Sequence, residues 1–587
     1  MLHKPVTQFC CYDNKSGRVI IKLITDSNAH AVTVMYGDPF LYAKSKKKDK
    51  SGNYIWDWEY SEAVMEKQYS SDEQIMWRAT ILPPKVKRMK YAFIVSDGGV
   101  KEVYFGDNTT SLSKKEFLNQ PFGFFFFPFI HDVDAPHVPA WAEDICWYQI
   151  FPERFFNGDP SISPPDTEDW ETAKPTWHSF YGGDLRGIIK KLPYLQELGI
   201  TGIYMTPVFL SPTNHKYNTQ DYYQVDPHFG DKKTLKELVK KAHDLGMKVM
   251  LDVVFNHIGS KHKFWLDVLE KQENSMYKDY FHIHDFPVKS NYKTPRDINF
   301  DAFAYSANMP KWNTENPQAR KFLIDVALYW IKELDIDGYR LDVSDEVSFD
   351  FWNDFRKAVK SCKENFYLCG EIWHDPTKWL GENCFDAVMN YPLGRVICDM
   401  FIYKKCDINT FNQKLAKTLM RFSDIHTRVM LNLLDSHDTT RLLTQAQGDK
   451  TALKNAFLFM FMMKGAPCIY YGTEIGMEGG HDPDCRRPMI WDAKKQDLEL
   501  LDFFKRLIGV RKQLSQLIQN ADVFYSKNKN ICCWTLAHNN DKISIIYNVG
   551  KKAVSINEDV LIAAGSNEDN MLPAKTLMVT KGEFCYE

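Results

Sequence analysis

The 587-residue sequence predicts an α/β protein: a (β/α)8 TIM barrel with an inserted subdomain after strand 3, flanked by N-terminal and C-terminal β-sandwich domains. From Ile145 to Tyr471 short apolar runs alternate with amphipathic helical segments, whereas both ends of the chain hold only short β-like runs separated by turn signals. Eight strand candidates that alternate with helices fit a closed parallel barrel better than an open doubly wound sheet.

Composition excludes several classes of partner. The net charge of -3 is made of interspersed signs, so we expect neither nucleic acid nor an anionic membrane as a partner, and a neutral substrate. The N-terminus lacks a signal-peptide pattern and no run of about 18 apolar residues occurs, which predicts a cytoplasmic protein with no membrane segment. The 13 cysteines include no Cys-x-x-Cys pair and are expected to be reduced thiols, without zinc or disulfides.

Residues 1–120 are predicted to form the N-terminal sandwich, because runs such as Val19–Ile24 and Tyr91–Val95 are separated by turn signals. The lysine-rich run Lys46–Gly52 is interpreted as a solvated hairpin loop, with a basic binding site as the alternative. Residues 121–140 are predicted to be a linker. The aromatic run Phe122–Phe129 within it is expected to form a buried seam between domains or subunits, a membrane-surface role being the alternative.

Residues 141–520 are assigned to the barrel. A helix over Leu185–Leu198 is expected to end at Gly199, and another is expected to begin at Asn316 and Pro317. The eight predicted strands are Ile145–Ile150, Ile200–Met205, Lys248–Val254, a run ending at Asp342, Phe366–Cys369, Ala387–Asn390, Val429–Leu434 and Cys468–Tyr471. Residues 258–316 are too long for an ordinary loop and predict a subdomain over the barrel mouth, and residues 521–587 predict the second sandwich.

Polar residues that follow the apolar strands are the candidates for the active site, because the carboxyl ends of barrel strands carry it. They are Asp252, Asn256 and His257; Arg340 and Asp342; Glu371; and His437 and Asp438. Any one strand-end carboxylate could be a helix cap. Four such groups on several strands are hard to explain as caps.

Arg340 and Asp342 occupy alternate positions of one strand, so their side chains should point the same way and touch. The arginine would lower the pKa of Asp342, which suits a nucleophile, although a structural ion pair explains this pair alone equally well. Glu371 precedes the apolar Ile372 and Trp373, which would raise its pKa and suit a general acid and base. A barrel mouth with several acids and no phosphate-binding loop, Ser-His-Asp arrangement or sulfur cluster indicates glycoside hydrolysis.

Four segments, 252–257, 338–342, 370–373 and 434–438, resemble the ordered signature regions of the α-amylase family of glycoside hydrolases. Met309–Asn313 and Asp482–Met489 resemble further motifs of the neopullulanase, cyclomaltodextrinase and maltogenic amylase subfamily. The resemblance implies a starch-binding-type N-terminal sandwich that builds a homodimer. It also implies a retaining reaction, in which the nucleophile and acid/base carboxyls lie about 5 to 5.5 Å apart.

The resemblance also implies residue roles. Asp342 would be the nucleophile, Glu371 the acid/base and Asp438 the carboxylate that stabilises the transition state. The implied substrate-binding residues are Tyr217, Asp252, Asn256, His257, Arg340, Glu346, Trp373 and His437. The chain has Val343-Ser344-Asp345-Glu346 where the subfamily more often has Val-Ala-Asn-Glu, so the balance of hydrolysis and transglycosylation could differ.

Members of the subfamily often bind calcium, and the matching residues here are Asn157, Asp159, Gly182 and Asp184. Ile162 and Ser163 replace two oxygen-rich residues of that loop, and calcium prefers at least six oxygen ligands. We therefore expect that no cofactor is required, with calcium as an optional ion.

The predicted function is hydrolysis of α-1,4 glucosidic bonds in cyclodextrins, maltodextrins and pullulan, with α-1,6 cleavage and transglycosylation left open. An oligo-α-1,6-glucosidase or another exo-acting relative is the alternative enzyme. A non-catalytic carbohydrate-binding protein is the alternative from another class, and the presence of all three acids argues against it. The sequence does not indicate which glucan is preferred.

Overall fold

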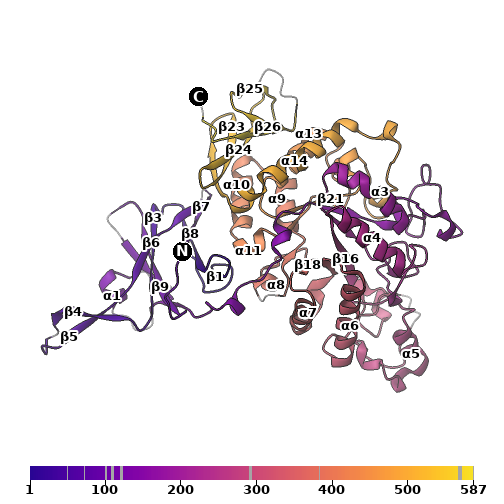
Figure 1. The fold of residues 1–587 in the computed structure, drawn as a ribbon, viewed down its shortest axis with the longest axis horizontal. Coiled ribbons are helices and arrows are strands. Elements are labelled where there is room, and N and C mark those ends of the chain that lie inside the picture. The colour runs from indigo at the N-terminus through magenta and orange to yellow at the C-terminus, as the bar shows by residue number, and fades with distance from the viewer. Residues whose placement is uncertain are drawn as a thin grey trace.

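The computed structural model describes residues 1–587 except 49, 72, 100–101, 108–111, 119–122, 290–293, 382–383, 566–570 and 586–587. In Figure 1 the N-terminal region lies to one side of a large helical and parallel-strand body, and the C-terminal strands lie above that body. The three parts follow one another along the chain, as the pattern of strand and helix signals predicts.

The N-terminal region is a sandwich of two antiparallel sheets with strand orders β1-β2-β8-β7 and β10-β9-β3-β6. Apolar side chains that alternate along these strands fill the space between the sheets, as the period of two requires. The strands are β1 (Cys10–Asp13), β2 (Arg18–Asp26), β3 (Ala31–Gly37), β6 (Ser61–Val64), β7 (Glu66–Ser70), β8 (Gln74–Ile81), β9 (Met89–Ser96) and β10 (Glu102–Phe105); the short helix α1 (Lys114–Leu118) follows.

The predicted linker differs from the structure at its start. Phe125–Phe127 forms strand β11, which pairs antiparallel with β9 and extends the sandwich beyond residue 120. Phe125 and Phe127 are buried in the sandwich core while Phe126 is exposed, because side chains alternate across a strand. The described part of the aromatic run is therefore mainly a sandwich strand and not a seam between domains; Phe122 lies outside the described residues.

A long hairpin projects from the sandwich (Figure 1). Its strands are β4 (Tyr42–Lys48) and β5 (Tyr54–Trp58), which pair with each other. The lysine run therefore begins inside β4, and only its end lies in the turn. Lysines on an exposed strand edge are a common protection against unwanted pairing.

The predicted barrel is confirmed. Its strands run in the order β19-β18-β17-β16-β13-β12-β21-β20, and a parallel bridge between Met389 and Leu431 closes the circle. The sixth and seventh strands are shorter than predicted, whereas the eighth begins two residues earlier than predicted. The eight are β12 (Trp147–Ile150), β13 (Gly202–Met205), β16 (Lys248–Val254), β17 (Gly338–Asp342), β18 (Tyr367–Gly370), β19 (Ala387–Val388), β20 (Leu431–Asn432) and β21 (Ala466–Tyr470).

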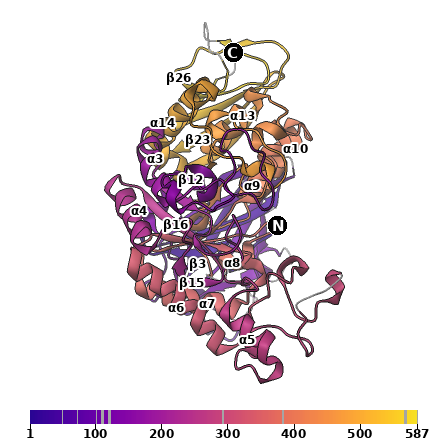
Figure 2. The ribbon, with the colours of Figure 1, turned by 90° about the vertical axis from the view of Figure 1, so that its right-hand side faces the viewer.

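Helices cover the outside of the barrel, and α4, α6 and α7 lie next to one another in Figure 2. Asn316 caps α6 through its side chain and Pro317 opens the helix, as predicted. The α-helices of the barrel and its loops are α2 (Pro152–Phe155), α3 (Leu185–Leu198), α4 (Lys232–Asp244), α5 (Lys263–Lys271), α6 (Pro317–Leu334), α7 (Phe349–Cys362), α8 (Thr377–Gly381), α9 (Tyr391–Phe401), α10 (Ile408–Leu419), α11 (Asp424–Thr427), α12 (Leu442–Gln445), α13 (Lys450–Phe461) and α14 (Leu498–Asn520).

The segment between β16 and α6 contains α5, short 3-10 turns and little regular sheet. Bridges from His257 to Lys311 and from Phe281 to Trp312 close it back onto the barrel. Trp312 is buried and stacks on Phe281 with ring centroids 5.2 Å apart, so aromatic packing holds this insertion together. A separate small hairpin, β14 (Phe209–Leu210) with β15 (Asp221–Val225), follows β13.

The C-terminal region forms antiparallel sheets, the larger in the order β22-β23-β24-β28-β26. It packs on α14 and on the N-terminal sandwich through β22 and β7. Its strands are β22 (Asp522–Lys527), β23 (Ile531–His538), β24 (Asp541–Asn548), β25 (Val554–Ser555), β26 (Val560–Ala563), β27 (Met571–Leu572) and β28 (Leu577–Lys581).

Candidate active site

The three predicted catalytic carboxylates line one cavity of about 490 Å³ at the carboxyl ends of the barrel strands. Asp342 is the last residue of β17, Glu371 follows β18, and Asp438 lies in the loop after β20. Phe303 and Met309 of the insertion line the same cavity, so the insertion contributes to the barrel mouth. The parallel strands thus bring together residues that are almost a hundred positions apart in sequence.

Arg340 lies at the centre of the acids and is fully buried. One terminal nitrogen, Nη1, is 2.5 Å from Asp342 Oδ1 and 2.9 Å from Asp252 Oδ2. The other, Nη2, is 2.7 Å from Glu371 Oε1. The predicted contact between Arg340 and Asp342 is present, and one guanidinium positions three carboxylates.

Asp342 does not have the low pKa that the sequence suggested. Burial raises the pKa of Asp342 well above its ordinary value, and the neighbouring Glu371 and Asp252 add to this shift while Arg340 opposes it. Burial also raises the pKa of Asp252 to about 6. Arg340 does act to lower the pKa of Asp342, as expected, but burial and the neighbouring carboxylates outweigh it, because one cation is shared among several buried acids.

Glu371 is held by two N–H donors. The main-chain amide of Val343 donates to Oε2 at 3.0 Å and the indole Nε1 of Trp373 donates to Oε1 at 3.1 Å. Val343 has a φ of 43°, which a β-branched residue rarely adopts. Sequence reasoning did not identify Val343, because its amide faces the acid only through this unusual backbone conformation.

A chain of hydrogen bonds runs beneath the cavity. Gln149 Nε2 donates to His437 Nδ1 at 2.8 Å, His437 Nε2 donates to the Tyr217 hydroxyl at 2.6 Å, and that hydroxyl donates to Asp252 Oδ2 at 3.0 Å. Burial lowers the pKa of His437 well below its ordinary value, so the imidazole is neutral, as this chain requires. The sequence analysis missed Gln149 and also Tyr204, whose hydroxyl donates to Asp252 at 3.0 Å. Both are polar residues within buried strands, which was an available signal.

Asp438 has two cationic or polar neighbours. Arg486 Nη2 lies 3.0 Å from its Oδ1 and His437 Nε2 lies 3.0 Å from its Oδ2. Arg486 also pairs with Asp482 at 3.0 Å, and both line the cavity. They belong to the motif Asp482–Met489 noted in the sequence, although neither had been singled out as a site residue.

The predicted binding residues divide into two layers. Tyr217, His257, Glu346 and Trp373 line the cavity. Asp252, Asn256, Arg340 and His437 lie behind its wall and are at most 1% exposed, so they position the wall in the free protein. Glu346 pairs with Lys311 of the insertion at 3.0 Å.

The predicted calcium loop uses its oxygen atoms for internal hydrogen bonds. Asp184 accepts from the amides of Gly158, Asp159 and Gly187, and Asp159 accepts from Ser161. Lys190 Nζ donates to the Gly158 carbonyl at 2.6 Å, which places an ammonium cation on this loop.

One buried oxygen of the loop, Asn157 Oδ1, has no hydrogen-bond partner among the described residues. A calcium ion requires about six to eight oxygen ligands. Within the described part of the chain no group of three or more His, Cys, Asp or Glu side chains could hold a metal. The residues at this loop do not fit a calcium ion.

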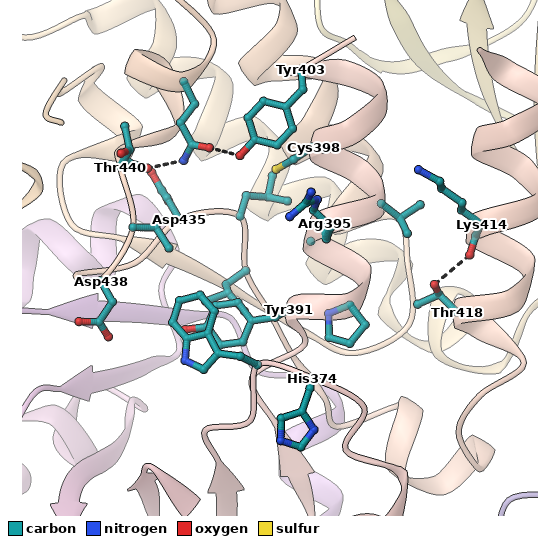
Figure 3. A pocket seen from close by; sticks show the side chains of 18 of the residues that line it. His374, Tyr391, Arg395, Cys398, Tyr403, Lys414, Thr418, Asp435, Asp438 and Thr440 are labelled. Atoms are coloured by element: carbon teal, nitrogen blue, oxygen red, sulfur yellow. Dashed lines mark hydrogen bonds between the residues drawn. The ribbon is translucent and has the colours of Figure 1, made fainter. Parts of the chain in front are cut away.

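A second cavity of about 890 Å³ adjoins the active-site cavity, and the two share Trp373 and Asp438 in their walls. Figure 3 shows this second cavity, with Asp438 on one side and Tyr403, Arg395 and Lys414 on the other. Trp373 is stacked on Tyr391 with ring centroids 3.9 Å apart and an interplanar angle of 12°. Among the described residues, no helix is both long enough and apolar enough to cross a bilayer.

Comparison with known families gives two matches. The family model "Alpha amylase, catalytic domain" matches residues 149–520, and "Alpha amylase, N-terminal ig-like domain" matches residues 1–131. The second match ends just beyond β11, in agreement with the sandwich boundary in the structure.

Comparison with known proteins gives full-length relatives. A cyclomaltodextrinase from Geobacillus thermopakistaniensis is 42% identical over 94% of this chain and 92% of its own length. An intracellular maltogenic amylase from Bacillus subtilis is 39% identical over 99% of this chain and 97% of its own. A solved structure of a cyclomaltodextrinase, 37% identical, superposes with a TM-score of 0.86 over 99% of both chains.

Proposed function

Since this chain belongs to the alpha-amylase family of glycoside hydrolases, we propose that it cleaves α-1,4 glucosidic bonds of cyclodextrins, maltodextrins and pullulan with retention of configuration. The names of its relatives, which include a neopullulanase 44% identical over 76% of this chain, support these substrates. Cleavage of α-1,6 bonds and transglycosylation are part of the same proposal. An oligo-α-1,6-glucosidase or a non-catalytic binding protein has no better support in the site.

The observation that carries the proposal is the pairing of Asp342 and Glu371 with the two terminal nitrogens of one guanidinium, that of Arg340. This arrangement keeps the two carboxyls close together in one cavity. A retaining glycosidase needs its carboxyls about 5 to 5.5 Å apart, whereas an inverting enzyme needs a wider gap to admit a water molecule. The shared cation therefore favours retention.

In the proposed first step, Glu371 gives its proton to the glycosidic oxygen as the carboxylate of Asp342 attacks the anomeric carbon. The bond to the leaving sugar breaks, the leaving chain departs as an alcohol, and Asp342 holds the remaining glucosyl group as an ester. In the second step, water attacks the anomeric carbon, Glu371 takes its proton, and Asp342 is released. The donors on Glu371 from Val343 and Trp373 stabilise the ionised form that this second step needs.

Asp438 is proposed to stabilise positive charge on the sugar ring in both transition states, because it lines the same cavity and pairs with Arg486. Arg340 and Asp252 are proposed to hold the nucleophile in position from behind the cavity wall. All of this chemistry is acid/base and nucleophilic, so we propose that no cofactor is needed.

The test measures reducing-end release from β-cyclodextrin, soluble starch and pullulan in parallel, with Glu371→Gln and Asp342→Asn as matched variants. Both should lower kcat by about a thousandfold or more. NMR of the first products should show the α-anomer. A β-anomer product would contradict retention, and unchanged activity in either variant would contradict its assigned role.

A homodimer built through the N-terminal sandwich is also proposed. Several large apolar side chains of the sandwich are exposed. Trp56 on the projecting hairpin is 61% exposed, and Phe40 just before the hairpin is 73% exposed. Val64 and Leu82 are 76% and 60% exposed. Exposed apolar groups of this kind indicate a protein interface, and the family relationship favours a second copy of this chain as the partner. Light scattering should give twice the chain mass for the wild type. The double variant Phe40→Ser with Trp56→Ser should have the mass of a monomer. A monomeric wild type would contradict the proposed homodimer.

The cellular location is proposed to be the cytoplasm. One relative is named an intracellular maltogenic amylase, and the 13 cysteines are all free thiols, most of them buried. Reduced cysteines are typical of that compartment. Fractionation of the source cells would test this directly.

A further inference from the structure

We propose that Ser344 is a positioning residue for Glu371: its hydroxyl fixes the main chain of the acid/base and, through it, the point from which the carboxyl delivers its proton. This inference rests on the proposed acid/base role of Glu371 and adds a residue to that mechanism. Ser344 follows the end of β17 by two residues and opens the short 3-10 turn Ser344–Glu346. It is fully buried and does not line the active-site cavity, so it can act on the reaction only through another residue.

Three positions at the end of β17 hold three different groups of Glu371. The hydroxyl of Ser344 donates to the main-chain carbonyl of Glu371 at 2.9 Å. The main-chain amide of Glu371 donates to the Leu341 carbonyl at 2.9 Å, and the Val343 amide donates to the carboxyl at 3.0 Å. The carboxyl is therefore carried by a backbone that is tied on both sides, and the serine supplies the tie on the carbonyl side.

Ser344 is itself held firmly. Its main-chain carbonyl accepts a hydrogen bond from the indole Nε1 of Trp352 at 2.9 Å. Its hydroxyl oxygen packs against Gly370, the residue before Glu371, where an added Cβ would lie 2.9 Å from that oxygen. Because Glu371 is only 6% exposed, loss of the hydroxyl would leave its buried carbonyl without this donor, which costs more than the loss of a hydrogen bond in water.

The next residue of the turn makes a second link to the same segment. Asp345 Oδ2 lies 2.9 Å from His374 Nε2. Water reaches both side chains, which are 24% and 57% exposed, and exposed pairs of this kind contribute little. The buried contact of Ser344 is therefore the one that we assign to the position of Glu371.

The position of Glu371 matters most where the leaving group needs a proton. In the proposed first step, a sugar alcohol leaves only as Glu371 gives its proton to the glycosidic oxygen. In α-maltosyl fluoride the bond from the anomeric carbon to fluorine breaks instead, and fluoride departs as an anion that needs little help from an acid. A displaced Glu371 should therefore slow the cleavage of a glucan more than that of the fluoride, whereas a general loss of structure should slow both alike.

The experiment compares kcat/KM for maltoheptaose and for α-maltosyl fluoride in the wild type, Ser344→Ala and Glu371→Gln. This parameter covers the steps up to the glycosyl ester, so the second chemical step does not enter. The control is Ser544→Ala in β24, because Ser544 is also fully buried and also donates to a main-chain carbonyl, that of Gly582, at 2.9 Å. If Ser344→Ala fails to fold, as judged by circular dichroism, Ser344→Cys replaces it, because a thiol is of similar size and donates only weakly.

Ser344→Ala should lower kcat/KM for maltoheptaose about fivefold, the loss that corresponds to one hydrogen bond, and that for α-maltosyl fluoride less than about twofold. Glu371→Gln should show the same selectivity with a much larger loss on maltoheptaose, and Ser544→Ala should leave both values unchanged. An unchanged value for maltoheptaose in the folded Ser344 variant, or equal losses on the two substrates, overturns the inference. A wild type inactive on maltoheptaose, or a Glu371→Gln variant as active as the wild type, overturns the proposed function instead.

Discussion

The main-chain amide of Val343 donates a 3.0 Å hydrogen bond to Glu371 while Val343 itself has a φ of 43° and a ψ of 45°. A β-branched residue in the left-handed region costs on the order of 1 to 3 kcal/mol and persists only where its surroundings fix it. Here the cost falls beside Glu371, the proposed acid/base, and it directs an N–H donor at that carboxyl. We interpret this unusual backbone conformation as local strain that holds the Glu371 carboxyl in position.

Replacing Val343 by glycine should relieve this strain. We expect Val343→Gly to raise the free energy of unfolding by about 1 kcal/mol and to lower kcat/KM several-fold, because the amide is then held less firmly. Val347→Gly is the control, since Val347 has a φ of -104° and gains nothing from glycine. Urea unfolding measures both variants. A loss of stability in Val343→Gly would contradict the interpretation that the backbone at Val343 is strained.

The raised pKa of Asp252 predicts a pH dependence of activity. Burial raises this pKa to about 6, so Asp252 takes up a proton as the pH falls through 6 and no longer accepts as a carboxylate from Arg340 and Tyr217. We expect the acid limb of kcat/KM near pH 6 to move to lower pH in Asp252→Asn, with lower activity at pH 7. Identical acid limbs in the two proteins would assign the limb to another group.

The raised pKa of Asp252 also predicts how the stability of the protein depends on pH. Because its folded pKa exceeds its ordinary value of 3.8, Asp252 favours the folded state below about pH 4, and this contribution is lost as the pH rises through 6. Stability of Asp252→Asn relative to the wild type should therefore increase between pH 4 and pH 7. Urea titrations at several pH values would show the opposite trend if Asp252 were held ionised.

A buried ion cluster joins the three parts of the chain. Lys22 of the N-terminal sandwich lies 2.5 Å from Asp424 of the barrel. Arg78 links Asp424, at 3.4 Å, to Asp522, at 3.0 Å, which is the first residue of β22 in the C-terminal sheet. Burial alone would raise the pKa of Asp424, but Lys22, Lys464 and Arg78 hold it well below its usual range. These contacts fix the sandwich on the barrel.

Asp424→Asn should lower the free energy of unfolding by about 3 kcal/mol, because it leaves Lys22 buried without its main anion. Lys22→Met combined with Asp424→Asn should cost less than the sum of the two single variants, since no uncompensated ammonium remains at that position. Thermal or urea unfolding of the four proteins gives the coupling. If the changes in the free energy of unfolding were strictly additive, the contact between Lys22 and Asp424 would contribute nothing to stability.

The loop around Asp159 and Asp184 should not depend on calcium, because its oxygens are used internally and Lys190 binds the Gly158 carbonyl. EDTA and added CaCl2 should each change Tm by less than about 1 °C. Lys190→Met should lower stability by about 1 to 2 kcal/mol, and Lys240→Met on the exposed face of α4 is the control. A large loss of Tm in EDTA would show that the ion is needed.

Much of the site could be predicted because polar residues at the ends of apolar strands can be recognised from the sequence. Asp342 ends one apolar strand, Glu371 and Asp438 come after two others, and a parallel barrel gathers such positions at one mouth. Gln149 and Tyr204 are polar residues within buried strands, which marks them as unusual, but the sequence does not show that their partners are His437 and Asp252. Val343 was missed because the type of a residue does not predict an unusual backbone torsion angle such as its φ of 43°.

Local spacing was enough to predict the barrel, most of its strands and helices, and the chemical identity of the acids, because periodicity and strand-end motifs are properties of neighbouring residues. Long-range packing was needed to show which acids share Arg340, which binding residues lie behind the cavity wall, and that Phe125–Phe127 completes a sandwich sheet. Burial and pKa depend on every group packed around a side chain, and those groups come from distant parts of the chain. This is why the sign of the Asp342 shift could not be taken from Arg340 alone.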